Sequence, residues 1–307
     1  MWTRDYWRAS LTGLAGSFFS LWLALTLSFV ILRSIPGDSI DAQMRSSGAS
    51  ESDIATYKQT LGLDRSLAVQ YARYLAGLAR GDFGRSLVTR EPVLNMIGAR
   101  LGPTLTLSGL ALLVACGLGI GTGAISNLGA LDRQNTLYRT TALLAAPLIT
   151  LALAAPIFWT GTIVLSLGGP STSIKTTLIP VLVLGFHASG PIGRVMSTSL
   201  NEAFAQPFIQ TARAKGLPDA LVFHHALKFA ILPVVSVIAL QAGFLLGGTV
   251  IIETIFTRRG LGSLMHQAAL NQDYPVVQGL VVLNAAFYAL TRRISDALRR
   301  RMDPRPG

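Results

Sequence analysis

The chain has 307 residues with a single cysteine; half of the residues are hydrophobic, 13% are charged and the mean hydropathy is +0.49. This composition excludes a pair of ordinary soluble domains and a disulfide or thiolate metal framework, and it indicates helices that face lipid or pack in a membrane-embedded bundle. The formal net charge of +11 does not indicate nucleic-acid binding, because the cations lie between apolar stretches and near the C-terminal end.

The first predicted element is an apolar stretch at residues 9–32, which contains no charge and is flanked by Arg8 and Arg33. It is long enough to cross a bilayer core, which needs about 20 residues. It lacks a small-residue cleavage site, so we interpret it as an uncleaved first span. Residues 33–100 are polar. Ser50 is a predicted helix cap, with Asp53 at the third helical position. Five apolar residues then share one helical face: Leu67, Tyr71, Tyr74, Leu75 and Leu78.

The second, third and fourth spans are predicted at about residues 104–125, 149–167 and 177–199. The second contains four small residues at alternate positions, which indicate close helix packing in lipid: Gly117, Gly119, Gly121 and Gly123. Residues 140–174 carry no charge and include three prolines, and one span preceded by an interfacial segment fits this stretch better than two spans. The fourth span contains His187, an ionisable group inside a membrane span and therefore a candidate for the solute path.

The longest polar interval of the second half is residues 202–233. Pro207 suits the first position of a short helix, and Gly216 suits the residue just past its end. Pro218 prevents helical continuation, and Asp219 begins a second amphipathic run that leads to Pro233. This interval is either a solvated connector or a helix presented to a soluble partner.

The fifth and sixth spans are predicted at about residues 229–252 and from just after residue 273 to about 290. Gly243, Gly247 and Gly248 suit close packing of the fifth span. Glu253 lies at its edge and is a second candidate for the solute path. Asp273 is predicted to cap the sixth span.

Six spans place both ends of the chain on one side of the membrane. The two short odd-numbered loops contain only three cations, Lys175, Arg258 and Arg259, whereas the termini and the even-numbered loops contain more. The positive-inside rule therefore predicts that both termini and residues 202–233 are cytoplasmic.

No G-x-x-x-x-G-K-[ST] sequence occurs, so any ATP hydrolysis would take place on another chain. An ATP-independent channel or an ion-coupled secondary transporter is the alternative to a transporter driven by ATP on another chain. The absence of a carboxylate inside a predicted span disfavours ion coupling, because a proton-coupled carrier normally needs an intramembrane acid or histidine relay. A membrane hydrolase built on His187 and Ser189 would lack the G-x-S-x-G turn. His224 and His225 are adjacent and do not share a helix face, and we predict no metal site.

Several motifs resemble the dipeptide/oligopeptide/nickel group of binding-protein-dependent ABC importer permeases. The sequence FIQTARAKG matches the cytoplasmic loop helix, in which the general pattern is E-A-A, three residues and a glycine. The acidic residue of that pattern is absent, and Pro233 comes four residues later than in the general pattern, as it does in this group. The segments IPGD, LGLDRSLAVQYARYL, GDFGRS and NQDYPVVQ also recur in the group, whereas Arg258 and Arg259 depart from E-T-V-F-x-x-P-G-L-G.

The resemblance implies an all-α integral membrane protein with six transmembrane helices and the type I ABC importer permease fold. Residues 1–100 would hold the first helix and an external helical subdomain, and residues 101–307 the five-helix core with the cytoplasmic coupling loop, 202–233. Pro233 would be a hinge. The residues implied to couple to the ATPase are Phe208, Gln210, Thr211, Ala212, Arg213, Ala214, Lys215 and Gly216.

The resemblance also implies the partners and the location. The partners would be a second homologous permease chain, two ABC ATPase subunits, an extracellular or periplasmic solute-binding protein and membrane lipid. ATP and Mg²⁺ would bind to the ATPase subunits, and this chain would bind no cofactor. The protein would be a multi-pass component of the bacterial inner membrane that transports peptides or a related small solute.

Overall fold

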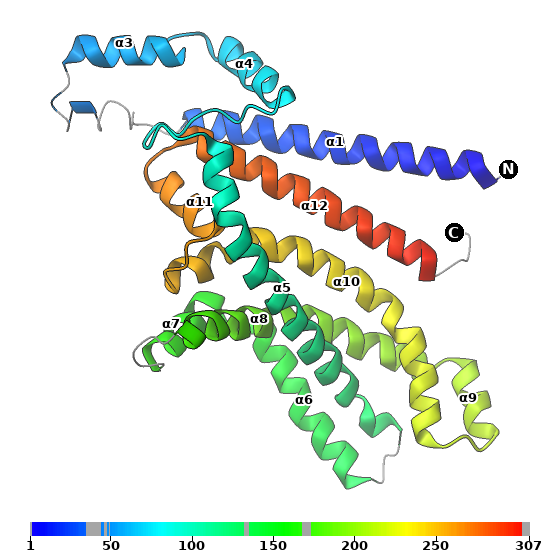
Figure 1. The fold of residues 1–307 in the computed structure, drawn as a ribbon. Coiled ribbons are helices and arrows are strands. Elements are labelled where there is room, and N and C mark those ends of the chain that lie inside the picture. Colours follow the sequence, from blue (N-terminus) through cyan, green and yellow to red (C-terminus); the bar gives the residue numbers. More distant parts are fainter. Residues whose placement is uncertain are drawn as a thin grey trace. The chain divides into compact units, whose positions relative to one another are not determined.

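The computed structural model describes residues 2–34, 44–45, 48, 50–131, 135–167 and 173–302. Its main elements are helices (Figure 1). In chain order they are α1 (Trp2–Ser34), α3 (Glu51–Leu61), α4 (Leu67–Ala79), α5 (Val93–Ile125), the 3₁₀ turn η1 (Leu128–Ala130), α6 (Thr136–Ala154), α7 (Ile157–Leu167), α8 (Ser173–Phe204), α9 (Pro207–Ala214), α10 (Asp219–Ile255), α11 (Leu261–Leu270) and α12 (Tyr274–Met302).

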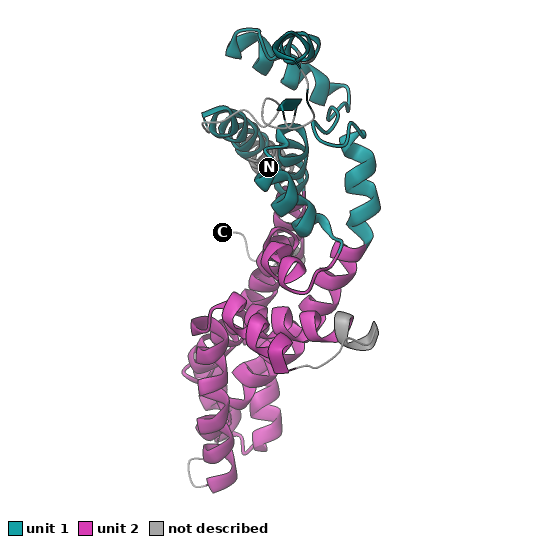
Figure 2. Ribbon diagram, turned by 90° about the vertical axis from the view of Figure 1, so that its left-hand side faces the viewer, with its two compact units in different colours: residues 1–102, 259–286 teal, residues 103–258, 287–307 magenta. Residues whose placement is uncertain are grey.

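The chain divides into two compact units, which Figure 2 shows in different colours. Unit 1 comprises residues 1–102 and 259–286, and unit 2 comprises residues 103–258 and 287–307. Unit 1 therefore contains α1, α3, α4 and α11, and unit 2 contains α6 to α10.

In unit 1 the predicted cap at Ser50 is confirmed, because its hydroxyl accepts from the Asp53 amide at 3.2 Å while the Asp53 carboxylate accepts from the Ser50 amide at 3.1 Å. Asp273 directly precedes Tyr274, the first residue of α12, so it occupies the predicted cap position. Its carboxylate accepts from the Ser86 hydroxyl and, at 3.0 Å, from the Leu87 amide. The Asp273 side chain thus also joins the loop before α5 to the start of α12.

In unit 2 the core lies where α8 and α10 pack along each other, and its members are fully buried apolar residues such as Ile192, Met196 and Val234. Only alternate members of the glycine run in α5 serve close packing. A Cβ at Gly119 would lie 2.7 Å from Ile192, and one at Gly123 would lie 2.6 Å from the Gly193 carbonyl oxygen. A Cβ at Gly117 or Gly121 would meet no described atom within 4 Å apart from the neighbouring backbone of its own helix.

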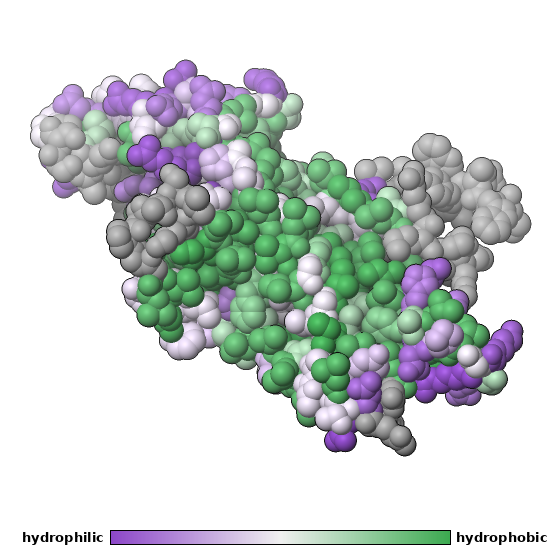
Figure 3. Space-filling model, turned by 60° about the horizontal axis from the view of Figure 1, so that its bottom comes forward, coloured by the Kyte–Doolittle hydropathy of each residue, from purple (hydrophilic) through white to green (hydrophobic). Residues whose placement is uncertain are grey.

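Within the described residues, five helices are long and apolar enough to cross a membrane: Val93–Ala130, Thr136–Ala154, Thr177–Phe204, Asp219–Ile255 and Tyr274–Leu298. In α1 the apolar helix found covers Phe18–Ser34. Figure 3 shows a largely hydrophobic surface, and α6, for example, leaves Leu143 and Leu144 about 70% exposed. Side chains of this kind suit a lipid or a partner helix as their neighbour.

The third span differs from the prediction of one span at residues 149–167. The membrane-length helix is α6, which ends at Ala154, and α7 is a separate shorter helix. Ala155 precedes Pro156 and is extended, with φ −71° and ψ 131°. A residue before proline is sterically pushed out of the helical region, so the chain breaks inside the stretch that was predicted to be continuous.

Candidate functional site

The short helix α9 lies between α8 and α10, and its ends follow from local sequence. Pro207 occupies its first turn, where a missing amide hydrogen costs no hydrogen bond. At the other end Gly216 has φ +71°, and its amide donates to the Arg213 carbonyl at 2.9 Å while the Leu217 amide donates to Ala212 at 3.2 Å. These two bonds form a Schellman motif, so the predicted stop at Gly216 is confirmed.

The helices on either side of α9 are longer than the predicted spans, although α10 begins at Asp219, where the sequence predicts an amphipathic run to begin. α8 continues to Phe204 and α10 begins at Asp219, so only residues 205–218 connect them. α10 also runs through Pro233 without ending there. Because proline has no amide hydrogen, the carbonyl of Phe229 lacks its usual helical donor at that point. The role of Pro233 as a hinge stays a prediction.

α9 has a buried face and an exposed face. Ile209 is completely buried and belongs to the core of unit 2, and Ala212 and Leu217 pack partly against the same core. Phe208 is 41% exposed, and its ring lies 5.9 Å from the ring of Phe229 on α10. The other predicted coupling residues, Gln210, Thr211, Arg213, Ala214, Lys215 and Gly216, are exposed. A single buried anchor thus fixes a helix whose outer face is open to a partner.

The two cations of this segment differ in their contacts. The Arg213 guanidinium donates to the Ala130 carbonyl in η1 at 3.0 Å, so this side chain holds α9 against its own chain. Lys215 is exposed and makes no ion pair with any residue that the structure describes. We predicted that both cations contact a partner. Lys215 is the one left available for such a contact.

The structure adds a polar cluster that the sequence did not predict. The Asn127 side chain is buried, and its amide donates to the Gly123 carbonyl at 3.1 Å and to the Ser197 carbonyl at 3.2 Å. It therefore joins the end of α5 to α8 just before η1. The sequence signal was weak, since an Asn after a glycine-rich span also suits an ordinary turn.

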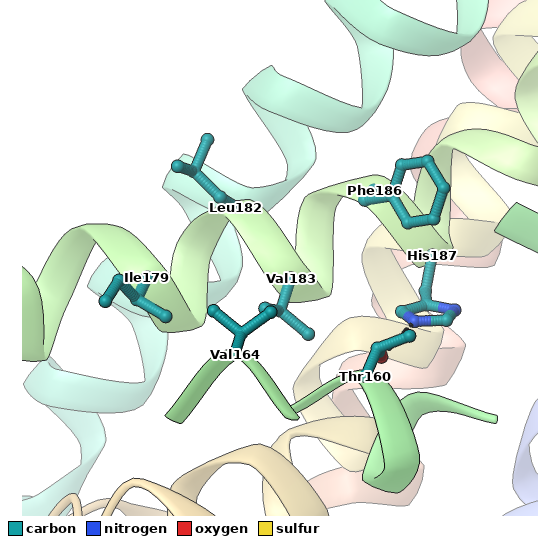
Figure 4. A pocket seen from close by; sticks show the side chains of 7 residues that line it. All are labelled: Thr160, Val164, Ile179, Leu182, Val183, Phe186 and His187. Carbon is teal, nitrogen blue, oxygen red and sulfur yellow. Dashed lines mark hydrogen bonds between the residues drawn. The ribbon is translucent and has the colours of Figure 1, made fainter. Parts of the chain in front are cut away.

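His187 lines a cavity of about 330 Å³ together with Thr160 and mainly apolar residues of α7 and α8 (Figure 4). Its Nδ1 lies 3.2 Å from the Ala152 carbonyl oxygen, and its Nε2 lies 2.7 Å from the Thr160 hydroxyl. In a continuous helix the Ala152 carbonyl would accept from the amide of residue 156. Pro156 has no such hydrogen, so the imidazole supplies the missing donor.

This geometry gives His187 a structural task, because it joins the end of α6 and the start of α7 to α8. A neutral ring that donates through Nδ1 accepts at Nε2 from Thr160. The Ser189 hydroxyl donates to the Phe186 carbonyl at 2.6 Å, so it is engaged with its own helix and does not form the pair of nucleophile and base that a hydrolase needs. The role of His187 in the solute path stays a prediction.

Glu253 is 1% exposed, in the last turn of α10, and its carboxylate accepts from the Thr104 hydroxyl on α5 at 2.6 Å. It is not among the residues that line the cavity at His187. The prediction placed Glu253 at the edge of a span. Within unit 2 it is a buried link between two helices, and its proposed role in the solute path is untested.

The model of the family described as "Binding-protein-dependent transport system inner membrane component" matches residues 107–307. Three relatives cover more than nine tenths of both chains. A putative peptide permease protein of Brucella suis is 35% identical, covering 92% of this chain and 94% of the relative. A di/tripeptide transport system permease of Pseudomonas aeruginosa is 32% identical, with 94% and 94% covered. A glutathione transport system permease of Salmonella paratyphi A is 32% identical, with 95% and 96% covered.

A solved structure of the MetNI methionine ABC transporter, in inward-facing conformations, contains a chain with a similar fold. The TM-score is 0.56 and the sequence identity is 17%, and the match covers 68% of this chain and 97% of that chain. This likeness concerns the fold alone. The family match and the relatives show that the chain belongs to the family of binding-protein-dependent transport system inner membrane components and is the membrane-spanning permease subunit of an ABC transport system.

Proposed function

We propose that this permease forms half of the translocation path of an importer for peptides or for glutathione-like solutes, and that α9 couples it to the ATPase. The solute class is supported by the relatives that are described as peptide, di/tripeptide and glutathione permeases. A second permease chain would complete the path, and two ATPase subunits would bind ATP and Mg²⁺. A solute-binding protein would deliver the solute.

The observation that carries the coupling role is the way in which α9 is fixed. One residue, Ile209, anchors it in the core formed by α8 and α10, and Arg213 ties it to η1. A displacement of α9 by a partner would therefore be transmitted to both α8 and α10, because α9 is fixed to them and does not move independently. The exposed face offers Lys215 and the aromatic ring of Phe208 to a partner.

The mechanism that fits this arrangement is a rigid-body movement. ATP-driven closure of the ATPase subunits would displace α9, and α8 and α10 would tilt and expose the solute path to alternate sides. Such a displacement requires contacts on α9 that differ between the two states of the ATPase. The weakened backbone bonding at Pro233 is suited to absorb part of the tilt.

The proposed topology has six spans. α1 would be the first span, in addition to the five helices identified by length and composition. Both termini and α9 would then be cytoplasmic. The segment with α3 and α4 would form an external helical subdomain next to the solute-binding protein.

The proposal is tested by reconstituting the purified transporter in proteoliposomes with its solute-binding protein and measuring uptake of radiolabelled dialanine and of glutathione. Uptake should require ATP on the side of the membrane on which α9 lies, and it should require the solute-binding protein. ATP-independent uptake would contradict the proposal and favour a channel or an ion-coupled carrier. If another solute is taken up in an ATP-dependent way, and neither dialanine nor glutathione competes with it, the proposed solute class would be contradicted. The proposed coupling role would not be affected by that result.

A further inference from the structure

Unit 1 contains a polar cavity of about 360 Å³ between α1, α4 and the start of α12. Three buried polar atoms of its lining residues have no hydrogen-bond partner within the part of the chain that the structure describes: Arg33 Nη1, Tyr74 Oη and Gln278 Nε2. Buried polar groups are paired in the great majority of cases, so three unpaired groups around one cavity require an explanation.

The Arg33 guanidinium is held in place although one of its nitrogens is unpaired. Its Nε donates to the Gln70 side chain at 2.7 Å, and Gln70 in turn donates to the carbonyls of Leu63 and Arg65 at 3.1 and 2.8 Å. The guanidinium also lies 4.2 Å from the centre of the Phe29 ring. The orientation of this cation is therefore set by the protein before any ligand binds.

Tyr74 differs from its neighbour Tyr71 on the same helix. Both rings pack against Phe29, with centroid distances of 5.9 and 5.2 Å. The Tyr71 hydroxyl is paired with Thr26 at 2.6 Å, whereas the Tyr74 hydroxyl is one of the unpaired groups. Burial raises the pKa of Tyr74 to about 12, and the phenol, which like any tyrosine is protonated at neutral pH, is available as a donor.

The missing partner is an acceptor with negative charge. The unpaired atoms Arg33 Nη1 and Gln278 Nε2 can only donate, and Gln278 is 5% exposed, so bulk water does not readily reach it. Two cations, Arg33 and Arg73, line the cavity against one acid, Asp82, whose Oδ1 already accepts from the Gly84 amide at 2.8 Å. A carboxylate matches this set, because it accepts several hydrogen bonds and pairs with a guanidinium.

We propose that this cavity is a binding site for a carboxylate group. Its volume falls at the lower end of the range for small-molecule pockets, about 300–1,000 Å³. The carboxylate belongs either to a free small molecule or to an acidic side chain of the solute-binding protein. The proposal does not depend on peptides being the transported solute.

The test uses the assembled transporter in nanodiscs and two matched probes, N-acetylalanine and its neutral amide. Titration calorimetry should detect binding of N-acetylalanine and no binding of the amide. The Tyr74→Phe variant removes a hydroxyl that has no partner among the described residues, so it should keep or raise the melting temperature while weakening binding at least about tenfold. The matched control, Tyr71→Phe, loses its bond to Thr26, so it should melt lower and bind N-acetylalanine as the wild type does.

A second variant, Gln278→Glu, places a carboxylate of the chain itself in the lining of the cavity that Arg33 also lines. It should raise the melting temperature and abolish binding of N-acetylalanine. If the wild type binds neither probe, the affinity for the solute-binding protein is compared between the wild type and Tyr74→Phe. A loss in the variant assigns the carboxylate to that protein. The proposal would be overturned if the wild type and Tyr74→Phe bound the solute-binding protein with equal affinity in that case, or if the two bound N-acetylalanine equally well. Either result would count whatever solute is transported.

Discussion

Arg213 lies in the last turn of α9 and Lys215 caps its C-terminal end, yet the two side chains differ in their contacts. Arg213 donates a hydrogen bond to the Ala130 carbonyl, whereas Lys215 is the residue that caps the C-terminal end of the helix. Guanidinium groups offer several donors in a fixed plane, which suits a bond to a backbone carbonyl, whereas an ammonium on a flexible stem suits a contact that forms and breaks. The partner contact that we propose therefore depends on Lys215 more than on Arg213.

Gly216 determines where α9 stops. It has φ +71° and open space around the position of a Cβ, so a substitution there changes the backbone energy and creates no clash. Gly216→Val should cost about 1–2 kcal/mol in the left-handed conformation and displace the end of α9. Membrane insertion should be normal, while solute-stimulated ATP hydrolysis and uptake should fall together.

The matched control for this position is Gly216→Asn, because asparagine tolerates the left-handed conformation. It should transport as the wild type does. ATP-driven uptake at the wild-type rate in Gly216→Val would contradict the coupling role proposed for α9. A loss of transport in both variants would show that the position matters for a reason other than its backbone conformation.

At the level of helices, α5 and α8 are joined by small residues and by one amide. Gly119 and Gly123 face α8 because they are four positions apart and so lie on one side of the helix, while Gly117 and Gly121 point elsewhere. Asn127 continues this side with its bonds to Ser197. In lipid, where apolar surface gains nothing by avoiding the solvent, such close contacts supply much of the association.

The two glycine types give a direct test of this packing. In Gly119→Val the added atoms meet Ile192 at 2.7 Å and the Ser189 carbonyl oxygen at 2.8 Å, and backbone cannot move aside easily. The free energy of unfolding, measured by denaturation in mixed micelles, should fall by about 1–3 kcal/mol, as overpacking usually costs. Gly121→Val adds the same atoms to open space and should leave stability near that of the wild type. Equal losses in both variants would contradict the packing described for α5 and α8.

At the level of the whole molecule, the mechanism that we propose requires α9 on the cytoplasmic side of the membrane and the helices α3 and α4 on the external side. The distribution of Lys and Arg supports this topology, with α9 in the cytoplasm. A docking helix on the wrong side could not meet a cytoplasmic ATPase. The topology is therefore the assumption on which the proposed coupling depends.

The topology can be tested by cysteine labelling in a Cys116→Ala background. Lys215→Cys, on the exposed end of α9, should react with a membrane-impermeant maleimide only after the cells are opened. Arg80→Cys, which replaces an exposed residue after α4, should react in intact cells. Labelling of Lys215→Cys in intact cells would contradict the cytoplasmic position of α9 and with it the proposed mechanism.

The sequence by itself determined the membrane class, the approximate positions of most spans, the ends of α9 and the family. These features depend on composition, on runs of about 20 apolar residues and on local stop signals such as Pro207 and Gly216, all of which act over a few neighbouring residues. The sequence missed the break at Pro156 within the third span, because several prolines in an uncharged stretch left the choice of the breaking residue open.

Only the tertiary structure decided which side chains meet. It paired His187 with the carbonyl left free by Pro156, Arg213 with Ala130, Glu253 with Thr104, and Asp273 with the loop at Ser86. It also brought together, at one cavity in unit 1, three polar groups that have no partner within the described residues. Each of these pairs joins residues that are at least 30 positions apart, and their meeting is set by how helices pack. Local periodicity and capping signals carry no information about such contacts, because they reflect only the backbone of the helix in which they occur.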